Sequence, residues 1–437
     1  MSKRKLNGLE RLAIGLSLLS LADRIVKLGL INHFFTRRPP ASLSSWPTVT
    51  ILQTVTRGVH GLRANLEARA RLDYPAHVQH ILVCDAADTE LRAICAETAA
   101  THPEMDLRIV CVEGDGIGPA TKLRKLQAGF PLATGDVLCL MDDDTAPRPD
   151  GLRHLVSYLS EPDTGASFGL ACFTNWGNVW SSMLSSYVNA YTLENFVTWA
   201  YLSRSALRVV GQMACYWRKP FEAAGAFAGL EGYIDDDFVL AKRLREAGLR
   251  PVQAPVVYDV NDPVATWREY ATKFNRWIIL PRVAMTPFMT PWQRAGAFLA
   301  TPATILLPGV LAGVTLLARS RPATYALAAT LGSFVAAQAF SYRRFMRRTM
   351  PRWGWLLLPY TVLVTPVHAV LTLLAGNEIE WRGQRLRVLP NGRFERMADE
   401  SPCQAASRKV PPRAGMKPPK AHSLLPARLT PEHTASS

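Results

Sequence analysis

Charged residues are scarce in this chain. They make up 19% of its 437 residues, while hydrophobic residues make up 48%; soluble domains usually carry about 25% charged residues. This balance excludes a disordered or acidic solvating protein, and it indicates that part of the chain faces lipid. The length is enough for about two to three domains of roughly 150 residues each.

Cysteine is scarce as well and shows no metal-binding pattern. The seven cysteines form no CxxC pair and no metal-ligand spacing with the nine histidines. Most of them lie inside apolar runs, which favours buried, reduced thiols over disulfides or zinc ligands. The cysteines are Cys84, Cys95, Cys111, Cys139, Cys172, Cys215 and Cys403.

Acidic residues are fewer than basic ones. The chain has 35 Asp and Glu against 50 Lys and Arg, which gives a net charge of +15. Such an excess suits nucleic acid, anionic lipid or a phosphorylated substrate, and does not choose among them. Many of the basic residues lie in predicted membrane loops and in the tail, so we expect no nucleic-acid partner.

Three long runs near the C-terminal end contain no Lys, Arg, Asp or Glu: 297–318, 325–342 and 355–375. Each is close to the ~20 residues that are needed to cross the hydrocarbon core of a bilayer. Three consecutive uncharged helices of this length are rare in a soluble domain. The runs therefore predict membrane spans rather than buried core helices.

The N-terminal stretch 9–31 is apolar but is interrupted by Asp23, Arg24 and Lys27. A charge near the bilayer centre costs up to about 2.5–3.5 kcal/mol. An amphipathic helix on the membrane surface therefore fits better than a span, which stays the alternative. No small-x-small cleavage pattern follows the stretch, so we expect no secretory signal. The basic residues that would face lipid phosphates are Lys3, Arg4, Lys5, Arg37 and Arg38.

Arginines in the short loops predict the orientation. Five lie between the second and third apolar runs and two between the first and second, so the positive-inside rule predicts a multi-pass protein of the cell membrane with a cytoplasmic catalytic domain. Three full spans would place the basic tail outside, so one run could be a re-entrant or interfacial segment broken at Pro308 or Pro366. Beyond Asp399 the tail is rich in Pro, Ser, Ala and Lys, and we expect it to be disordered.

Apolar runs alternate with polar helical stretches between residues 47 and 144, which predicts an α/β domain. Continuous apolar strands that alternate with helices indicate a mostly parallel sheet covered on both faces. Ligands of such sheets bind beyond the carboxyl ends of the strands. The predicted strands are 49–52, 80–84, 107–112 and 137–141, and the predicted helices are 61–70, 89–99 and 122–128.

Acidic residues follow two of these strands at the point where each strand ends. Asp85 and Asp88 follow the second strand and could accept hydrogen bonds from a nucleotide base or ribose. Asp142 and Asp144 follow the fourth strand and project to the same side, so they could hold one Mg²⁺ or Mn²⁺ that neutralises a substrate diphosphate. An arbitrary acidic triplet is more often a solvated turn, but the position at a strand end favours the metal site.

A second acidic triplet, at residues 235–237, precedes a predicted helix over 238–247. Helix capping and the helix dipole explain one or two of these carboxylates. A third, crowded by like charges, could have a raised pKa and serve as a general base.

Downstream, Lys273 and Arg276 lie three residues apart on a predicted helix and are followed by Trp277. On its own, such a basic helix beside a membrane is more often an interfacial anchor than a binding site.

Together, in this order and at these distances, the elements resemble the ceramide glucosyltransferase family of membrane-bound, nucleotide-sugar-dependent transferases. The pattern of that family is three separated Asp sites followed by (Q/R)xxRW. The resemblance covers roughly residues 48 to 390 and includes four further segments: LDYP at 72–75, TKL at 121–123, GQMACYWRK at 211–219 and WRGQRLR at 381–387.

The resemblance implies a Rossmann-like nucleotide-diphospho-sugar transferase domain that uses a UDP-sugar donor, Mg²⁺ or Mn²⁺, and a lipid acceptor. It implies that Asp237 deprotonates the acceptor and that Asp142 and Asp144 hold the metal and the diphosphate. The residues expected to contact the donor or the acceptor entrance are Asp85, Asp88, Lys122, Lys273, Arg276 and Trp277.

Three departures from the family pattern bear on the acceptor. Lys273 stands where Gln or Arg is usual, Arg124 replaces an Asn, and no His lies between Asp142 and Asp237, where animal members carry one. From the resemblance we expect an inverting transfer of glucose from UDP-glucose to ceramide. Because of the departures, a hopanoid or diacylglycerol stays an alternative acceptor. A processive polysaccharide synthase would need more spans, and three intact acidic sites argue against a catalytically silent membrane scaffold.

The predicted organisation has four parts. An N-terminal membrane-associated helix and linker covers 1–45, and the cytosolic glycosyltransferase domain covers 46–290. Transmembrane or re-entrant helices cover 291–378, and a basic, mostly disordered tail covers 379–437.

Overall fold

A computed structural model describes residues 6–40, 43–56, 59–114, 121–203, 205–300, 302–381, 384–390 and 392–397. The described residues up to Arg396 belong to one compact unit. The predictions for Lys3, Arg4, Lys5 and Arg382, and for the tail beyond Asp399, lie outside the described residues.

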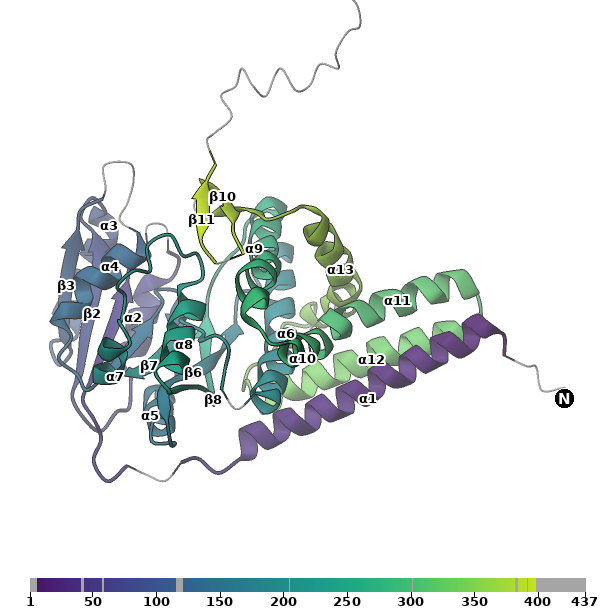
Figure 1. The fold of residues 1–437 in the computed structure, drawn as a ribbon, viewed down its shortest axis with the longest axis horizontal. Coiled ribbons are helices and arrows are strands. Elements are labelled where there is room, and N and C mark those ends of the chain that lie inside the picture. Colours follow the sequence, from purple (N-terminus) through teal and green to yellow (C-terminus); the bar gives the residue numbers. More distant parts are fainter. Residues whose placement is uncertain are drawn as a thin grey trace, which may run out of the picture. The chain divides into compact units, whose positions relative to one another are not determined.

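An eight-stranded sheet organises the part of the chain before residue 290 (Figure 1). Its strand order is β3-β2-β1-β4-β7-β6-β8-β5. The pairs β1/β2, β1/β4, β2/β3 and β6/β8 are parallel, and β4/β7, β6/β7 and β5/β8 are antiparallel. The strands are β1 (Val49–Thr54), β2 (Val78–Asp85), β3 (Asp106–Val112), β4 (Val137–Met141), β5 (Thr145–Ala146), β6 (Thr164–Phe173), β7 (Met213–Trp217) and β8 (Arg250–Val260).

The α/β prediction is confirmed, with one correction. The four predicted strands form the parallel half of the sheet, in which β1 and β4 are buried along their whole length. Such strands are covered on both faces and therefore read as continuous apolar runs. The other half adds three antiparallel pairs, so the sheet is mixed, although most of its pairs are parallel.

Helices cover both faces of the sheet. Leu126 of α4 and Leu240 of α8 pack with Leu52 on one face, and Leu155 of α5 packs with Ile51 on the other. The helices of this part are α2 (Leu62–Ala70), α3 (Thr89–Thr101), α4 (Lys122–Gly129), α5 (Gly151–Tyr158), α6 (Val179–Leu202), α7 (Arg218–Ala223), α8 (Asp236–Glu246) and α9 (Trp267–Leu280), with short helical turns η1 (Phe130–Leu132), η2 (Pro281–Met285) and η3 (Thr286–Phe288).

The three predicted apolar runs are helical. α12 (Arg321–Arg344) and α13 (Gly354–Leu374) are each long and apolar enough to cross a membrane. α10 (Pro291–Ala300) and α11 (Pro302–Ala318) together form a third candidate that is bent by 54° between Pro291–Ala300 and Ile305–Ala318. The expected break at Pro308 or Pro366 is wrong, because both prolines lie inside continuous helices.

The N-terminal helix α1 (Gly8–Thr36) turns its polar side chains inward. Arg24 is buried and pairs with Glu194 of α6 at 3.3 Å, and Lys27 is buried and donates to the carbonyl of Ala300. Leucines and isoleucines of the helix are exposed instead, with Ile25 70% exposed. The charges of Arg24 and Lys27, which interrupt the apolar stretch, therefore have partners inside the protein. Arg37 likewise donates to a backbone carbonyl of the sheet, that of Gln253.

Part of the expected disordered tail is folded. Three antiparallel strands follow α13: β9 (Glu378–Trp381), β10 (Gln384–Val388) and β11 (Phe394–Arg396). The backbone N–H of Ile234 donates to the carbonyl of Gly392, and Phe394 N–H donates to Gly232. These two hydrogen bonds join the small sheet to residues 232–234, which directly precede the second acidic triplet in the sequence.

Candidate active site

One cavity of about 1540 Å³ lies beyond the carboxyl end of β4 and extends to the apolar helices. Its polar part contains both acidic triplets. Of the predicted site residues, Lys122, Asp142, Asp144, Asp237, Lys273, Arg276 and Trp277 line this cavity, and Asp85 and Asp88 are not among its lining residues.

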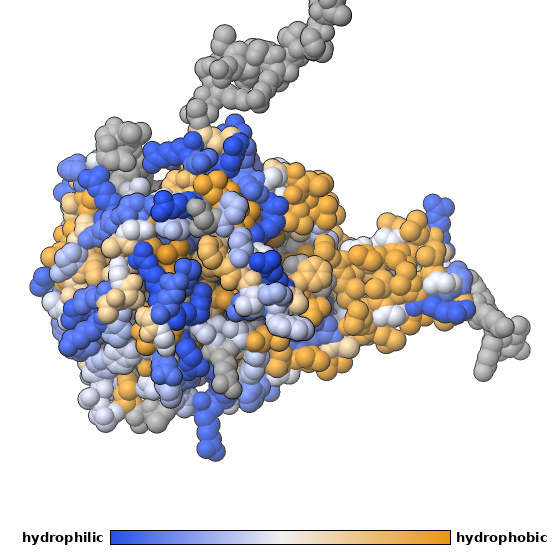
Figure 2. Space-filling model, viewed as in Figure 1, coloured by the Kyte–Doolittle hydropathy of each residue, from blue (hydrophilic) through white to orange (hydrophobic). Residues whose placement is uncertain are grey.

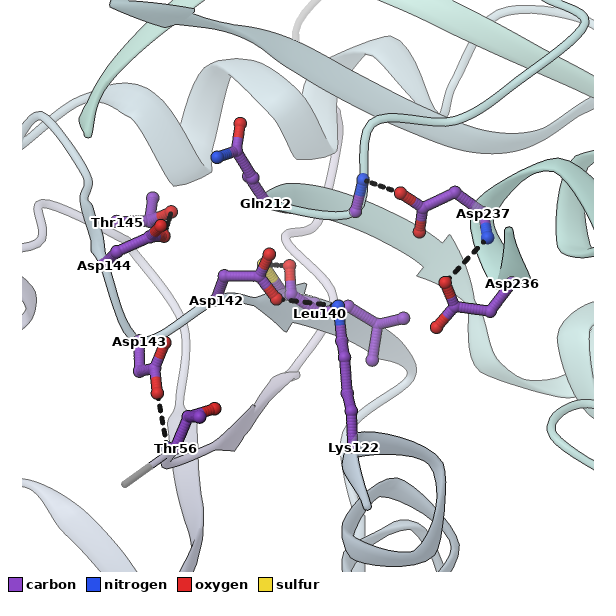
Figure 3. A network of polar contacts seen from close by, with 12 residues as sticks. Thr56, Lys122, Leu140, Asp142, Asp143, Asp144, Thr145, Gln212, Asp236 and Asp237 are labelled. Atoms are coloured by element: carbon purple, nitrogen blue, oxygen red, sulfur yellow. Dashed lines mark hydrogen bonds and ion pairs between the residues drawn. The ribbon is translucent and has the colours of Figure 1, made fainter. Parts of the chain in front are cut away.

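Asp142 is the first residue after β4 and is joined to Lys122, the first residue of α4 (Figure 3). The Lys122 ammonium donates to Asp142 Oδ1 at 2.8 Å. Burial opposes the charge on this ammonium, but the carboxylates of Asp142, Asp236 and Asp237 outweigh burial and raise the pKa of Lys122. Lys122 is therefore a fixed cation between the two triplets.

The other members of the first triplet differ in their surroundings. The Asp143 carboxylate accepts the backbone N–H of Thr56, so it fastens the loop after β1. Among the described residues, the hydrogen bond to the Asp144 carboxylate comes from the neighbouring Thr145 hydroxyl at 3.3 Å. Burial and the charges of Asp142 and Asp143 raise the pKa of Asp144 to about 8.

The backbone of this triplet is held by two α2 side chains that the sequence does not predict as site residues. Asn65 donates to the carbonyl of Asp143 at 2.8 Å, and the fully buried Arg69 donates to that of Asp142 at 2.9 Å. Both residues bond to backbone atoms, and such contacts have no sequence pattern that could predict them.

Asp142 and Asp144 fit a divalent cation. Both line the same cavity, and both offer the carboxylate oxygens that Mg²⁺ and Mn²⁺ prefer. Burial first, and then the charges of Asp142 and Asp143, raise the pKa of Asp144, and a bound cation would favour its ionised form. Within the described part of the chain no group of three or more His, Cys, Asp or Glu side chains is placed to hold a metal. The two aspartates would therefore share the ion with substrate oxygens.

In the second triplet the capping role belongs to Asp235. Its Oδ1 accepts the backbone N–H of Phe238 at 3.2 Å, and α8 begins at Asp236, two residues earlier than predicted. The Asp236 carboxylate accepts the backbone N–H of Asp237 (Figure 3). Asp237 itself lies within the helix, so its carboxylate is not needed as the N-cap.

The Asp237 carboxylate is held from the opposite side of the cavity. Its Oδ2 accepts the backbone N–H of Gly211 at 3.0 Å (Figure 3). A Cβ at position 211 would lie 2.2 Å from Asp237 Oδ1, so only glycine allows this approach. Arg208 is a further member of the site that the sequence does not predict. Its Nε lies 3.4 Å from Asp235 Oδ1, and its Nη2 lies 3.9 Å from Asp237 Oδ2.

Burial and the neighbouring charge of Asp236 raise the pKa of Asp237 to about 7, although Lys122 and Arg208 act in the opposite direction. A carboxylate with a pKa near the working pH is suited to general base catalysis, because it is ionised in part and still binds a proton well. A strongly raised pKa in a cavity is typical of a functional group.

Asp85 and Asp88 lie at the end of β2 as predicted. Their carboxylates accept hydrogen bonds from nearby backbone N–H groups. Asp85 Oδ1 accepts the backbone N–H of Ala87 at 3.1 Å, and Asp88 caps α3 by accepting the N–H of Leu91. Asp88 thus has a structural role, and contact of either residue with a nucleotide stays a prediction.

The helix α9 carries the last predicted group. Lys273 forms an ion pair with Asp262, a partner that the sequence does not point to. The Arg276 guanidinium lies over the ring of Trp381 in β9, 5.7 Å from its centroid. Trp277 stacks on Tyr187 of α6 with 6.3 Å between ring centroids, and both residues line the cavity.

The apolar half of the cavity is built by α6 together with helices that follow the eight-stranded sheet in the sequence. Val188 and Trp199 come from α6, Phe298 from α10, Ile305 from α11 and Leu373 from α13. A polar centre with two sets of carboxylates therefore continues without interruption into an apolar compartment.

The match to a family model shows that the protein is a glycosyltransferase. The chain belongs to glycosyl transferase family 21, whose family model matches residues 12–394. This match confirms the resemblance to the ceramide glucosyltransferase family. Among solved structures, the chain is similar to a mannosyltransferase from Pyrobaculum calidifontis in complex with GDP-Man and Mn²⁺, with 19% identity and a TM-score of 0.49. That similarity covers 83% of this chain and 99% of that chain.

The pH dependence of transfer should report the pKa of Asp237. We expect kcat/KM to rise with pH through about 7, because the base must be ionised to accept a proton. In Asp236→Asn the acid limb should move to lower pH, since the like charge that disfavours ionisation of Asp237 is gone. Rate profiles of both proteins test this. An unchanged limb in the variant would show that another group titrates.

Proposed function

We propose that this glycosyltransferase moves a hexose, with glucose from UDP-glucose as the first candidate, onto the hydroxyl of a membrane lipid such as ceramide. The observation that carries the proposal is the single cavity that joins the two acidic triplets to the apolar faces of α6, α10, α11 and α13. A water-soluble, charged donor suits one half of this cavity, and a lipid acceptor suits the other.

Asp237 is the proposed general base. It removes the proton of the acceptor hydroxyl while that oxygen attacks the anomeric carbon of the sugar. The bond from this carbon to the diphosphate breaks, and its electron pair leaves with UDP. Such a single displacement inverts the α-linked donor to a β-glycoside. The N–H of Gly211 fixes the Asp237 carboxylate, and its raised pKa fits the task.

The departing diphosphate carries the negative charge of the reaction. Lys122 and Arg276 line the cavity and offer two cations for it. Asp142 and Asp144 would hold Mg²⁺ or Mn²⁺, which supplies further positive charge to the diphosphate. We propose that Asp85 binds the nucleoside beyond them. This arrangement divides the work among three carboxylate sites: one binds, one coordinates and one takes a proton.

The acceptor can be a hopanoid or a diacylglycerol in place of ceramide, because the apolar half of the cavity selects for a lipid and does not specify its headgroup. A processive polysaccharide synthase is the less favoured alternative. Its product would have to leave through a channel enclosed by more membrane helices than the two or three candidate spans of the described residues. Lipid analysis of cells separates these products, since a single-hexose lipid and a polymer differ in extraction and mass.

Asp237→Asn keeps the size of the side chain and removes the base. We expect transfer by the purified enzyme to fall by about 10²–10⁴, the range for lost general base catalysis. UDP-sugar binding should change little, because Lys122, Asp142 and Asp144 remain. Cells expressing the wild type should contain a lipid with one added hexose that cells expressing the variant lack. Near-normal turnover of the variant would contradict the assignment.

Asp142→Asn and Asp144→Asn should each weaken binding of Mn²⁺ and abolish transfer, and excess EDTA should do the same to the wild type. The matched control is Asp143→Asn, in which the side-chain oxygen can still accept the N–H of Thr56. Mn²⁺ binding by electron paramagnetic resonance and turnover are measured on all three variants. Full turnover of the wild type in excess chelator would exclude the metal role.

A further inference from the structure

The two ends of α13 contact the same domain, although this helix is apolar enough to cross a membrane. At its start, Trp353 lies edge to face with Trp176, which follows β6, and the two ring centroids are 6.4 Å apart. After its end, Asn377 Oδ1 accepts a hydrogen bond from Arg282 of η2 at 2.8 Å. A helix that crosses the bilayer would deliver its two ends to opposite sides.

The middle of α13 contacts that domain too. The His368 ring lies 3.3 Å from the hydroxyl of Tyr270 in α9 and 5.0 Å, between ring centroids, from Trp267. The C-terminal part of the helix thus packs along α9, which carries Lys273 and Arg276, and Thr372 also donates to Asn275 there.

The loop before α13 lies on the catalytic side as well. Arg348 donates to Asp259 of β8 at 3.1 Å, and Arg148, which follows β5, donates to the carbonyl of Met346. The chain therefore leaves the catalytic domain after α9 and has returned to it by residue 346. An even number of crossings must lie between these points, and α11 and α12 provide two.

The helices α1, α11 and α12 share one largely apolar belt, in which the charged side chains of α1 (Asp23, Arg24 and Lys27) are paired. Ser17 of α1 donates to the carbonyl of Ala326 in α12, and Thr315 of α11 donates to that of Ala323. No Asp, Glu, Lys or Arg occurs at 12–22, 302–318 or 322–342. The far end of the belt is marked by Glu10, Arg11, Arg319 and Arg321, and the near end by Arg343 and Arg344, beside the catalytic domain.

The outward face of this bundle is apolar. Ile25 of α1, Leu316 of α11 and Tyr325 of α12 are each about 70% exposed, and Figure 2 shows hydrophobic residues over this part of the surface. The polar groups of α1 point inward, where Gln338 of α12 joins Arg24 by donating to Glu194. Paired polar groups inside and leucines outside are typical of helices surrounded by lipid.

We propose that α1, α11 and α12 cross the bilayer and that α13 lies in the plane of the membrane on the catalytic side. In Figure 1 the first three helices run side by side, and α13 runs across them. The 17 residues of α11 and the 24 of α12 are roughly 25 and 36 Å long at 1.5 Å per residue, which brackets the ~30 Å hydrocarbon core.

This topology assigns a lipid surface to α13. Its exposed side chains, among them Leu356, Val367 and Leu374, face acyl chains, and the buried Ala369 and the partly exposed Leu373 line the cavity. A helix in this position forms one side of the entrance through which a lipid reaches the carboxylates from within the membrane leaflet. It also places the C-terminal sheet on the side of the active site.

Labelling with an impermeant maleimide in intact cells tests the topology without any measure of activity. Three proteins are compared, each with all other native cysteines replaced by serine. One keeps only Cys111, which is exposed in β3 and reports the catalytic side. The others carry Ser320→Cys, between α11 and α12, or Ser437→Cys, at the last residue of the sequence.

In intact cells we expect the cysteine of Ser437→Cys and Cys111 to share the same access to the maleimide, either both labelled or both protected. The cysteine of Ser320→Cys should show the opposite result, and all three should be labelled after lysis. If Ser437→Cys follows Ser320→Cys, α13 crosses and the proposal is wrong. If all three agree, α11 and α12 do not cross. Should the cysteine replacements prevent folding, an epitope tag inserted at Ser320 or appended after Ser437 of the otherwise native chain gives the same comparison by antibody access before and after permeabilisation.

Discussion

Repulsion among the six carboxylates of two acidic triplets is the constraint around which the site is built. The structure compensates most of it with fixed donors: Lys122 stands between the triplets, Asp143 takes the N–H of Thr56, and Asp235 caps α8. Burial nevertheless raises the pKa of Asp143, Asp144, Asp235 and Asp237, with the large shifts at Asp144, to about 8, and at Asp237, to about 7. These two are the groups to which we assign a cation and a proton, so the electrostatic imbalance coincides with the proposed chemistry.

The second constraint is that donor and acceptor come from different solvents. A nucleotide sugar is charged and arrives from water, whereas a lipid stays in the bilayer, so the reacting atoms can meet only where a polar cavity adjoins apolar helices. The cavity satisfies this requirement because its lining includes both acidic triplets and apolar side chains of α6, α10, α11 and α13. An in-plane α13 would keep this cavity open to one leaflet.

Local patterns predicted the parallel half of the fold and most of the site. The sequence predicts the strands that end at Asp85 and Met141 because central parallel strands are apolar along their whole length. It predicts the first acidic triplet as a site because the triplet directly follows the end of β4. The antiparallel strands and the small C-terminal sheet were missed because they depend on pairing between distant segments. Arg69 and Asp262 were missed for a related reason: their roles come from tertiary contacts with Asp142 and Lys273. The inward orientation of the charges of α1 was not predictable for the same reason, because it depends on the ion pair between Arg24 and Glu194, 170 positions away in the sequence.

The most direct test of the central claim is the anomeric configuration of the product. The claim is that Asp237 activates a lipid hydroxyl for one in-line displacement, with no sugar–enzyme bond formed on the way. Proton NMR of the glycolipid made by the wild-type protein from an α-linked UDP-sugar measures the coupling of the anomeric proton and so reads the configuration. The account predicts a β-linked product from the first turnover. An α-linked product would contradict it, because retention requires a different reaction course and leaves no role for Asp237 as the base of a single displacement.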